Sequence, residues 1–362
     1  MKIGIILGTR PEIIKMAGII TLCENEGLDY FVLHTGQHYS YNMDRAIYQD
    51  LKLPDPRYNL KIGSSTHAQN TAAILEKAEL VLQKEMPDIV LVEGDTNTVL
   101  AGALAASKLK IKVGHVEAGL RSDDPNMPEE MNRILTDHIS HLLFCPTALA
   151  RERLIKEKVD PGRIYLTGNT IVDAVNRNIG FALKKSRILQ RLKLGKKKYF
   201  LITAHRQENV DNKKTLSSIL ASLETLYNRY NWPVIYPVHP RTDKMIRKFK
   251  IRIPSAIKVI DPVNYFDFLN LEASAGAILT DSGGIQEEAC ILKVPCITLR
   301  ENTERPETLK EGSNILAGTD PERILRSVEV MLGRKANWDN PFGDGKTGEN
   351  ILKIIQDQFI SS

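Results

Sequence analysis

The sequence predicts an α/β protein of two doubly wound domains, each built on a parallel sheet, that face one another. Short apolar runs alternate with amphipathic stretches along nearly the whole chain, as in parallel strands joined by helices. The Lys- and Arg-rich stretch 178–198 interrupts this alternation, which then restarts. A chain of 362 residues also exceeds one ordinary hydrophobic core. We therefore expect one domain at 1–170 and a second at 171–346.

The apolar runs give the expected strands in order. In the first domain they are 3–7, 30–34, 89–93, 112–116, 142–145 and 163–166. Between them, the stretches 11–26, 66–85, 96–108 and 129–141 carry apolar residues at helical spacing. The expected strands of the second domain are 199–203, 234–238, 256–260, 276–280 and 296–299. A final helix over 347–359 follows a turn-rich stretch and fits either domain.

Composition and charge narrow the possible partners and the compartment. Apolar residues make up 42% of the chain and charged residues 26%, as in soluble globular proteins. The net charge of +5 is too small to indicate a nucleic-acid partner, and no apolar run is long enough to span a membrane. The N-terminal apolar run ends at Leu7, before charged residues, which favours a buried strand over a signal sequence. Four cysteines without CxxC spacing indicate reduced, buried thiols in a cytoplasmic protein and no metal framework.

The segment AILTDSGGIQEE, residues 277–288, is typical of a phosphate site. An apolar run delivers Gly283 and Gly284 to the start of a helix, where unpaired backbone N–H groups and the helix dipole favour an anion. Glu288 lies one turn inside that helix, and a carboxylate there suits the two vicinal hydroxyls of a ribose. Together these features indicate a nucleotide. The alternative is a tight turn whose glycines serve packing alone.

Further polar residues follow the other expected strands, at the edge where open parallel sheets bind ligands. Arg10 follows the first strand in GTRPE, a turn that we expect to accept a second anion, and Lys15 comes one helical turn later. Asp95 and Glu117 follow the third and fourth strands. His205 follows the first strand of the second domain beside an arginine, which favours a phosphate contact over an ordinary surface histidine.

Structural roles remain open for several of these acids. Asp95 could cap the helix that begins at Thr96, a role that aspartate often fills. Glu129 and Glu130 follow a proline and could be first-turn acids favoured by the helix dipole. Glu117 has a weaker structural explanation, because a carboxylate directly after a buried run needs a partner or solvent.

Two other patterns carry little weight. The stretch GDGKTG, residues 343–348, matches G-x-G-x-x-G. No strand precedes it and no acidic residue stands about 20 positions further on, so we expect only a turn that starts the last helix. His138 and His141 share a helix face without a third ligand nearby, and we interpret them as structural.

The strand-end residues together resemble the family of non-hydrolysing UDP-N-acetylglucosamine 2-epimerases. The resemblance rests on GTRPEIIKM, GDTNTVLAGALAA, GHVEAGLRS, PEEMNR, TGNTIVDA, DPVNYFDFL, LTDSGGIQEE, TERPE and NPFGDG, which span almost the whole chain in the expected order. It implies two Rossmann-like domains with a cleft between them, similar to GT-B glycosyltransferases, and a C-terminal helix, 347–362, that crosses back to the first domain. The implied reaction interconverts UDP-N-acetylglucosamine and UDP-N-acetylmannosamine, a precursor of cell-surface polysaccharide, in a homodimer without metal or nicotinamide.

The resemblance also assigns residues to roles. The diphosphate ligands would be Arg10, Lys15, His205, Ser282, Gly283 and Gly284, with His205 counted among the catalytic residues as well. Glu288 would hold the ribose, and Phe268 would lie near the uracil. The acid–base carboxylates would be Asp95, Glu117 and Glu129, and lesser candidates for substrate binding are Arg133 and Arg300.

A regulatory role is implied for the loop that contains Gln37 and His38. In bacterial relatives such a loop binds a second substrate molecule that activates the enzyme. Here the segment continues YSYN, which departs from the bacterial pattern.

Chemistry independently favours elimination over oxidation as the route to inversion at carbon 2. The hydrogen on that carbon is not acidic, and oxidation of a neighbouring carbon would need a hydride carrier, for which the sequence has no credible fingerprint. Expulsion of UDP instead gives carbon 1 oxocarbenium character and acidifies the hydrogen, and UDP then re-adds to the glycal. The leaving diphosphate needs strong anion binding, and the two ring faces need carboxylates.

Other functions stay open at this point. A hydrolysing epimerase would release UDP and free N-acetylmannosamine, and a diacetamido uronate could replace the sugar. A GT-B glycosyltransferase would use the same UDP-sugar as a donor but would need an acceptor. A nucleotide-sugar sensor would bind UDP without turnover.

Overall fold

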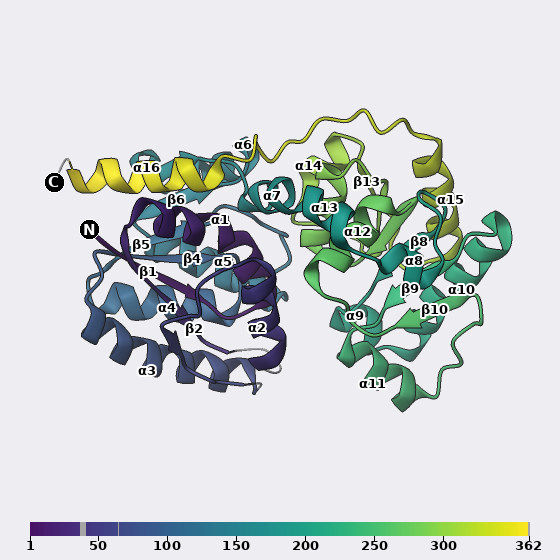
Figure 1. Ribbon diagram of the computed structural model, residues 1–362, viewed down its shortest axis with the longest axis horizontal. Helices are drawn as coiled ribbons and strands as arrows, with labels where there is room; N and C mark the ends of the chain where they lie inside the picture. Colours follow the sequence, from purple (N-terminus) through teal and green to yellow (C-terminus); the bar gives the residue numbers. More distant parts are fainter. Residues whose placement is uncertain (37–40, 64, 361–362) are drawn as a thin grey trace. The chain divides into compact units, whose positions relative to one another are not determined.

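The computed structural model describes residues 1–36, 41–63 and 65–360, which form two compact units (Figure 1). Unit 1 comprises Met1–Asn176 and Phe342–Ser362, and unit 2 comprises Arg177–Pro341. The first boundary falls inside helix α7 (Thr170–Lys185) and not after residue 170, because this helix continues without a break past the end of unit 1. The return to unit 1 begins before residue 347, because Phe342 is fully buried and its carbonyl accepts a hydrogen bond from the Asn169 N–H at 2.8 Å.

In the described residues, unit 1 has a parallel sheet of seven strands in the order β3-β2-β1-β4-β5-β6-β7. The strands are β1 (Lys2–Leu7), β2 (Asp29–His34), β3 (Tyr58–Asn59), β4 (Ile89–Glu93), β5 (Lys112–Val116), β6 (Leu142–Cys145) and β7 (Ile164–Leu166). All six strands expected here are present, and only the two-residue edge strand β3 was not expected. The chain reverses its direction of travel across the sheet between β1 and β4, so the ligand-binding switch point lies beyond their carboxyl ends.

Helices cover both faces of this sheet, which explains why its central strands are apolar almost throughout. They are α1 (Arg10–Glu26), α2 (Tyr41–Asp50), α3 (His67–Glu85), α4 (Asn97–Lys108), α5 (Pro128–Ile139), α6 (Ala148–Lys156), α7 and α16 (Thr347–Ile360), with a short 3-10 helix at Pro161–Arg163. Helix α2 lies in a stretch where the sequence pattern predicts no helix.

Unit 2 repeats the doubly wound arrangement with six parallel strands in the order β10-β9-β8-β11-β12-β13, all within the described range 177–341. The strands are β8 (Phe200–Thr203), β9 (Val234–Pro237), β10 (Ile257–Ile260), β11 (Ala277–Thr280), β12 (Cys296–Thr298) and β13 (Asn314–Leu316). The helices are α8 (Ile188–Leu192), α9 (Gln207–Val210), α10 (Lys213–Tyr230), α11 (Pro240–Phe249), α12 (Tyr265–Ser274), α13 (Gly283–Ile291), α14 (Pro306–Lys310) and α15 (Pro321–Gly333). Its switch point lies beyond β8 and β11, and the predicted fold class is confirmed.

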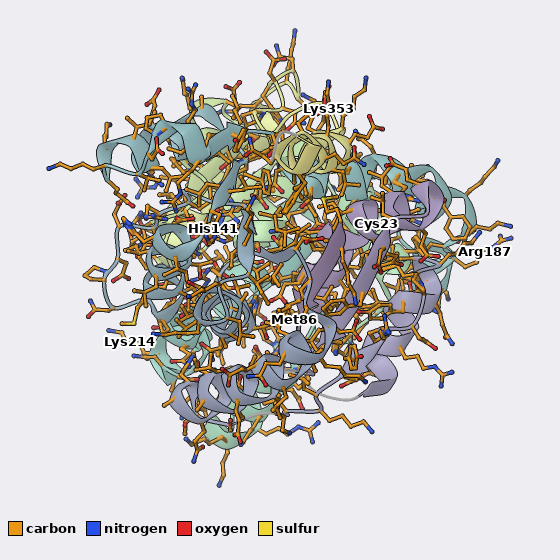
Figure 2. The ribbon with its side chains drawn as sticks, turned by 90° about the vertical axis from the view of Figure 1, so that its left-hand side faces the viewer. Cys23, Met86, His141, Arg187, Lys214 and Lys353 are labelled. Carbon is orange, nitrogen blue, oxygen red and sulfur yellow. The ribbon has the colours of Figure 1, made fainter. Side chains whose placement is uncertain are left out.

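The core and surface follow the ordinary division between apolar and charged side chains. Cys23, labelled in Figure 2, is fully buried, and the other three cysteines are buried and free as well. The labelled Arg187, Lys214 and Lys353 are exposed. Within residues 1–36, 41–63 and 65–360, no helix combines the length and the hydropathy of a membrane span.

Helix α16, the yellow helix in Figure 1, packs on α1 within unit 1. Its first turn is held by Asp173 of α7, whose carboxylate accepts hydrogen bonds from the N–H groups of Thr347 at 3.2 Å and Gly348 at 2.9 Å. These are two of the donors that a helix N-terminus leaves without an intrahelical acceptor. The glycine-rich stretch 343–348 is therefore a turn that leads into a capped helix, as its sequence context indicates.

Removal of this cap should destabilise unit 1. We expect Asp173→Ala to lower the free energy of unfolding by about 1–2 kcal/mol, the usual cost of a lost helix cap. Urea denaturation of the full chain measures this difference. Asp173→Asn, which keeps one acceptor oxygen, should lose less, and equal stability of the wild type and Asp173→Ala would contradict the capping role.

Candidate active site

Each unit holds a set of the predicted site residues on the segments that follow its strands. The first half-site, in unit 1, comprises Arg10, Lys15, Asp95, Glu117, Glu129 and Arg133. The second half-site, in unit 2, comprises His205, Phe268, Ser282, Gly283, Gly284, Glu288 and Arg300. The predicted regulatory residues Gln37 and His38 lie outside the described residues.

The turn before α1 is built around a buried carboxyl group. Glu12 accepts hydrogen bonds from Gly8 N at 2.6 Å, from Thr9 Oγ1 at 2.9 Å and from Thr96 Oγ1 at 2.8 Å. A Cβ at Gly8 would stand 2.1 Å from Thr35 Oγ1, so only glycine fits the turn. The sequence predicts a second anion-binding turn here. The Gly8 N–H is not available to an anion, because it already donates a hydrogen bond to Glu12. The half-buried Arg10 is the first residue of α1 and lies beside this turn.

Glu12 should make stability depend on pH. Burial raises the pKa of Glu12 from 4.5 to about 7, although the hydrogen bonds from Thr96, Gly8 and Thr9 oppose the change. Between these values the folded chain holds a proton that the unfolded chain has lost, so stability falls as the pH rises from 4.5 through 7. A displacement of this size corresponds to about 3 kcal/mol.

The comparison that tests this dependence is Glu12→Gln against the wild type by urea unfolding at pH 4 and pH 8. We expect the variant to gain about 3 kcal/mol relative to the wild type between the two pH values. Glu76→Gln, on the exposed side of α3, is the matched control and should show no such gain. The same difference at both pH values for Glu12→Gln would show that Glu12 titrates normally.

Lys15 lies in a buried cluster with two glutamates. Its Nζ stands 2.6 Å from Glu117 Oε2 and 3.0 Å from Glu93 Oε1. The second oxygen of Glu117 accepts a hydrogen bond from Asn169 Nδ2 at 3.3 Å. Glu117 itself has a φ of +74°, a left-handed conformation that costs energy for a side chain with a Cβ, and burial of this strained carboxylate is typical of a functional residue. Lys15 lies one turn into the first helix, as the sequence predicts. In that position it is also an ion-pair partner of Glu117.

Asp95 follows β4 and forms an ion pair with Arg133 of α5. Arg133 is buried and also binds Glu130 at 2.8 Å. The helix-cap interpretation of Asp95 is wrong, because α4 begins at Asn97 with Thr96 as its N-cap residue. The Asp95 side chain keeps 30% of its surface exposed, which leaves it accessible to a ligand.

The two acids at the start of α5 have different environments. Glu130 is buried, and its carboxylate accepts hydrogen bonds from Ser122 N at 2.9 Å and Asp123 N at 3.0 Å, so it holds the loop after β5. Glu129 is half-buried and makes no hydrogen bond or ion pair with any residue that the structure describes. Of the pair, Glu129 is the one with a carboxylate available for chemistry.

The second half-site is organised by Asp281, directly after β11. Its Oδ2 accepts hydrogen bonds from the backbone N–H of His205 at 2.9 Å and of Arg206 at 3.0 Å, and from Asn209 Nδ2 at 3.0 Å. Its Oδ1 lies 3.2 Å from His205 Nδ1. Burial raises the pKa of Asp281, but His205 and these hydrogen bonds outweigh burial and lower it to about 2. An ionised Asp281 thus orients His205, whose side chain stays 42% exposed.

The two glycines at the start of α13 serve different purposes. A Cβ at Gly283 would stand 2.7 Å from Glu304 Oε1, so packing alone requires this glycine. A Cβ at Gly284 would meet no atom of the described residues within 4 Å. Ser282, the N-cap residue, makes no side-chain cap hydrogen bond. The packing interpretation therefore holds for Gly283 and fails for Gly284, where an open approach to backbone N–H groups suits an anion.

Glu304 connects the predicted Arg300 to this turn. Arg300 is buried, and its Nη1 binds Glu304 Oε2 at 2.7 Å, while Arg206 binds Glu304 Oε1 at 3.1 Å. Arg300 thus forms an ion pair with Glu304, the residue that packs against Gly283.

Two further predicted residues lie on α12 and α13. Glu288 is buried, and its carboxyl group contacts that of the fully buried Glu272. Burial and then the charge of Glu288 raise the pKa of Glu272 well above its ordinary value. Phe268 is half-buried at the edge of the unit 2 core.

Several residues that shape the site were missed by reasoning from sequence: Glu12, Glu93, His115, Asp137, Glu272 and Asp281. His115 is fully buried, with Nδ1 2.7 Å from Asp137 and Nε2 2.9 Å from the Gly94 carbonyl, and it supports the loop that carries Asp95. For two of the other missed residues, the sequence does contain a signal. Asp281 directly follows a strand, and Glu93 is an acid at the end of an apolar run.

The fold and the two half-sites define a class, namely α/β proteins with two doubly wound sheets and polar or acidic residues at each switch point. The family model described as UDP-N-acetylglucosamine 2-epimerase matches residues 21–356, and the chain belongs to this family. The family predicted from the sequence motifs is thus confirmed.

Individual relatives agree with this assignment. A UDP-N-acetylglucosamine 2-epimerase of Methanocaldococcus jannaschii is 54% identical over 361 residues, which cover 98% of this chain and 99% of that protein. A crystal structure of the M. jannaschii UDP-GlcNAc 2-epimerase with UDP-GlcNAc and UDP has a TM-score of 0.93 at 53% identity, covering 98% of this chain and 99% of that one. A UDP-2,3-diacetamido-2,3-dideoxy-D-glucuronate 2-epimerase of Pseudomonas aeruginosa is 39% identical, with 98% and 99% covered.

Proposed function

We propose that this chain is an isomerase that interconverts UDP-N-acetylglucosamine and UDP-N-acetylmannosamine. The observation that carries the proposal is the pairing of Asp95 and Glu117 at the carboxyl ends of the adjacent strands β4 and β5. One acid is partly exposed and bound to Arg133, and the other is buried against Lys15. Two carboxylates in such different surroundings suit two different proton-transfer roles.

The reaction proceeds in this proposal by elimination and re-addition. The C–O bond between carbon 1 and the diphosphate breaks, its electrons leave with UDP, and a carboxylate removes the proton from carbon 2 to give the glycal. UDP then re-adds to carbon 1 while a proton returns to the other face of carbon 2. Asp95 and Glu117 act near carbon 2, and Glu129 supports protonation or the positive charge at carbon 1.

The second half-site is the proposed location of the nucleotide. Gly283 and Gly284 bind the diphosphate through backbone N–H donors at the start of α13, helped by the positive end of the helix dipole. Ser282 binds it through its hydroxyl group, because its backbone N–H already donates to Thr280 Oγ1 at 3.0 Å. His205, oriented by Asp281, is a further diphosphate ligand. Glu288 binds the ribose, Phe268 lies near the uracil, and Arg300 supports the turn through Glu304.

Arg10 and Lys15 supply further positive charge for the leaving diphosphate. Arg10 is half-buried at the start of α1 and offers a planar fork that matches phosphate oxygens. Lys15 stabilises the ionised form of Glu117 as well, because the two groups form an ion pair at 2.6 Å.

The assembly and the compartment belong to the same proposal. We expect a homodimer, because α5 exposes Met131, Ile134 and Leu135, which are 60%, 37% and 44% accessible and lie at helical spacing on one face. A cytoplasmic location fits the four free thiols. Sedimentation of the purified chain tests the first expectation.

The test of the activity is incubation of the purified protein with UDP-N-acetylglucosamine in heavy water, followed by NMR. We expect UDP-N-acetylmannosamine to form without an acceptor and without accumulation of UDP, and deuterium to enter carbon 2. Stoichiometric release of UDP and free N-acetylmannosamine would favour a hydrolysing epimerase. Bound UDP with neither turnover nor exchange would indicate a sensor.

The P. aeruginosa relative gives one specific reason for a second candidate substrate, the diacetamido uronate. A side-by-side measurement of kcat/KM for both UDP-sugars separates the two. The greater likeness to the M. jannaschii protein leads us to expect the higher value for UDP-N-acetylglucosamine.

A further inference from the structure

The first half-site contains a buried cluster that has more carboxyl groups than positive charges. Glu12, Glu93 and Glu117 are all less than one-tenth exposed, and Lys15 is the cation that contacts two of them. If all three acids were ionised, the cluster would carry a net charge of −2 in a site with little solvent. The cluster is therefore more stable when at least one of its carboxyl groups keeps a proton.

Glu93 is the unexplained member of this cluster. It is the last residue of β4, where an apolar side chain would continue the run IVLV, and the acid–base roles proposed above do not use it. Its carboxyl group lies close enough to that of Glu117 for a hydrogen bond, which requires a proton on one of the two. The Lys15 ammonium donates a hydrogen bond to Glu117, whereas its 3.0 Å contact with Glu93 Oε1 lacks hydrogen-bond geometry.

These contacts assign the proton. Glu117 accepts from Lys15 and from Asn169, which favours its ionised form. Glu93 receives no such donation at Oε1 from the described residues. Burial, opposed by Lys15, and then the charges of Glu117 and Glu12 raise the pKa of Glu93 well above its ordinary value. The other titratable neighbour, His115 on β5, is engaged by Asp137 and the Gly94 carbonyl.

We propose that Glu93 is a positioning residue that holds one proton and donates it as a hydrogen bond to Glu117. This inference rests on the function proposed above for Glu117. In this arrangement Glu117 faces the substrate as a carboxylate with a fixed orientation and a moderated basicity. Glu117 takes the proton from carbon 2 into the pair, and Asp95, the other acid near carbon 2, delivers a proton to the opposite face as UDP re-adds. The pair then releases its extra proton to solvent, so it gains and loses one proton per turnover. Glu93 does not touch the substrate.

The arrangement predicts how activity depends on pH. When Glu93 loses its proton at alkaline pH, it repels Glu117 and competes with it for Lys15, so turnover should fall. Glu93→Gln keeps a donor to Glu117 but has no proton to lose. We expect its kcat at neutral pH to stay within about threefold of the wild type and its alkaline decline to be absent. Glu93→Leu removes the donor and should lower kcat by roughly tenfold or more.

A matched control and a second readout separate this inference from the proposed function. Glu85→Gln replaces another buried glutamate of unit 1, one that binds Lys2 and Tyr58, and should leave the pH profile of kcat unchanged. An infrared difference spectrum of the full chain, wild type minus Glu93→Gln, should contain the band of a protonated carboxyl group at neutral pH.

The outcomes are distinct. An alkaline decline that persists unchanged in Glu93→Gln, in a chain that epimerises, would overturn the role of Glu93. A difference spectrum with only an ionised carboxylate band would overturn it as well, whether or not the chain is active. A wild type that shows the protonated band but no epimerisation would overturn the proposed function and leave the shared proton standing.

Discussion

Replacement of Glu117 by Gln should lower kcat by on the order of 10²–10⁴-fold, the usual contribution of a general acid or base. The amide keeps the shape of the side chain and can still accept a hydrogen bond from Lys15, so the fold should persist. It cannot take a proton from carbon 2. Asp95→Asn and Glu129→Gln should also depress turnover, with Asp95→Asn retaining an acceptor oxygen for Arg133.

The matching measurement is UDP affinity, which should change little in the three amide variants because the three acids are assigned to the sugar ring and not to UDP. Steady-state kinetics and calorimetric titration with UDP give the two quantities. Glu76→Gln on the exposed side of α3 controls for loss of a carboxylate as such. Normal turnover in all three amide variants would refute the acid–base assignment.

Replacement of Gly284 by Ala should weaken UDP binding by roughly 10- to 100-fold, with no loss of stability. The added methyl group meets no described atom within 4 Å, so the fold accommodates it. It would stand where the diphosphate approaches the backbone donors at the start of α13. Loss of one hydrogen bond to a charged group costs about 1.5–3 kcal/mol, which corresponds to that range of affinity.

Two other glycines make this test selective. Gly180→Ala, at an exposed site in α7 with no atom near the new Cβ, should stabilise the helix by up to about 1 kcal/mol and leave UDP affinity unchanged. Gly283→Ala should instead reduce stability, because its Cβ would stand 2.7 Å from Glu304 Oε1. If Gly284→Ala bound UDP as tightly as the wild type, the anion-binding role of this turn would be disproved.

The sequence predicted the sheets well because their physical signal is local. Buried parallel strands need apolar residues on both faces, and the runs that become β1 and β4 satisfy this requirement by themselves. The rule that ligands gather beyond strand ends then directed attention to Asp95, Glu117 and His205. The strands that escaped prediction, β3 and β13, are two and three residues long and carry too few residues for a pattern.

The chemistry of the clusters could not be predicted, because it depends on contacts between distant parts of the chain. Lys15 was assigned to a phosphate from its helical position, whereas its contact with Glu117 spans 102 residues. In the sequence, Glu93 is only the last residue of an apolar run. In the structure, its carboxyl group contacts the same lysine. Likewise, the difference between Gly283 and Gly284 arises from Glu304, which is remote in sequence.

The central claim is that the bond between carbon 1 and the diphosphate breaks and re-forms during every inversion. Positional isotope exchange tests it most directly, with UDP-N-acetylglucosamine that carries ¹⁸O in the oxygen between carbon 1 and the β-phosphorus. We expect the label to move into the non-bridging positions of the β-phosphate while the sugar epimerises. Epimerisation with the label retained entirely in the bridge would contradict the account.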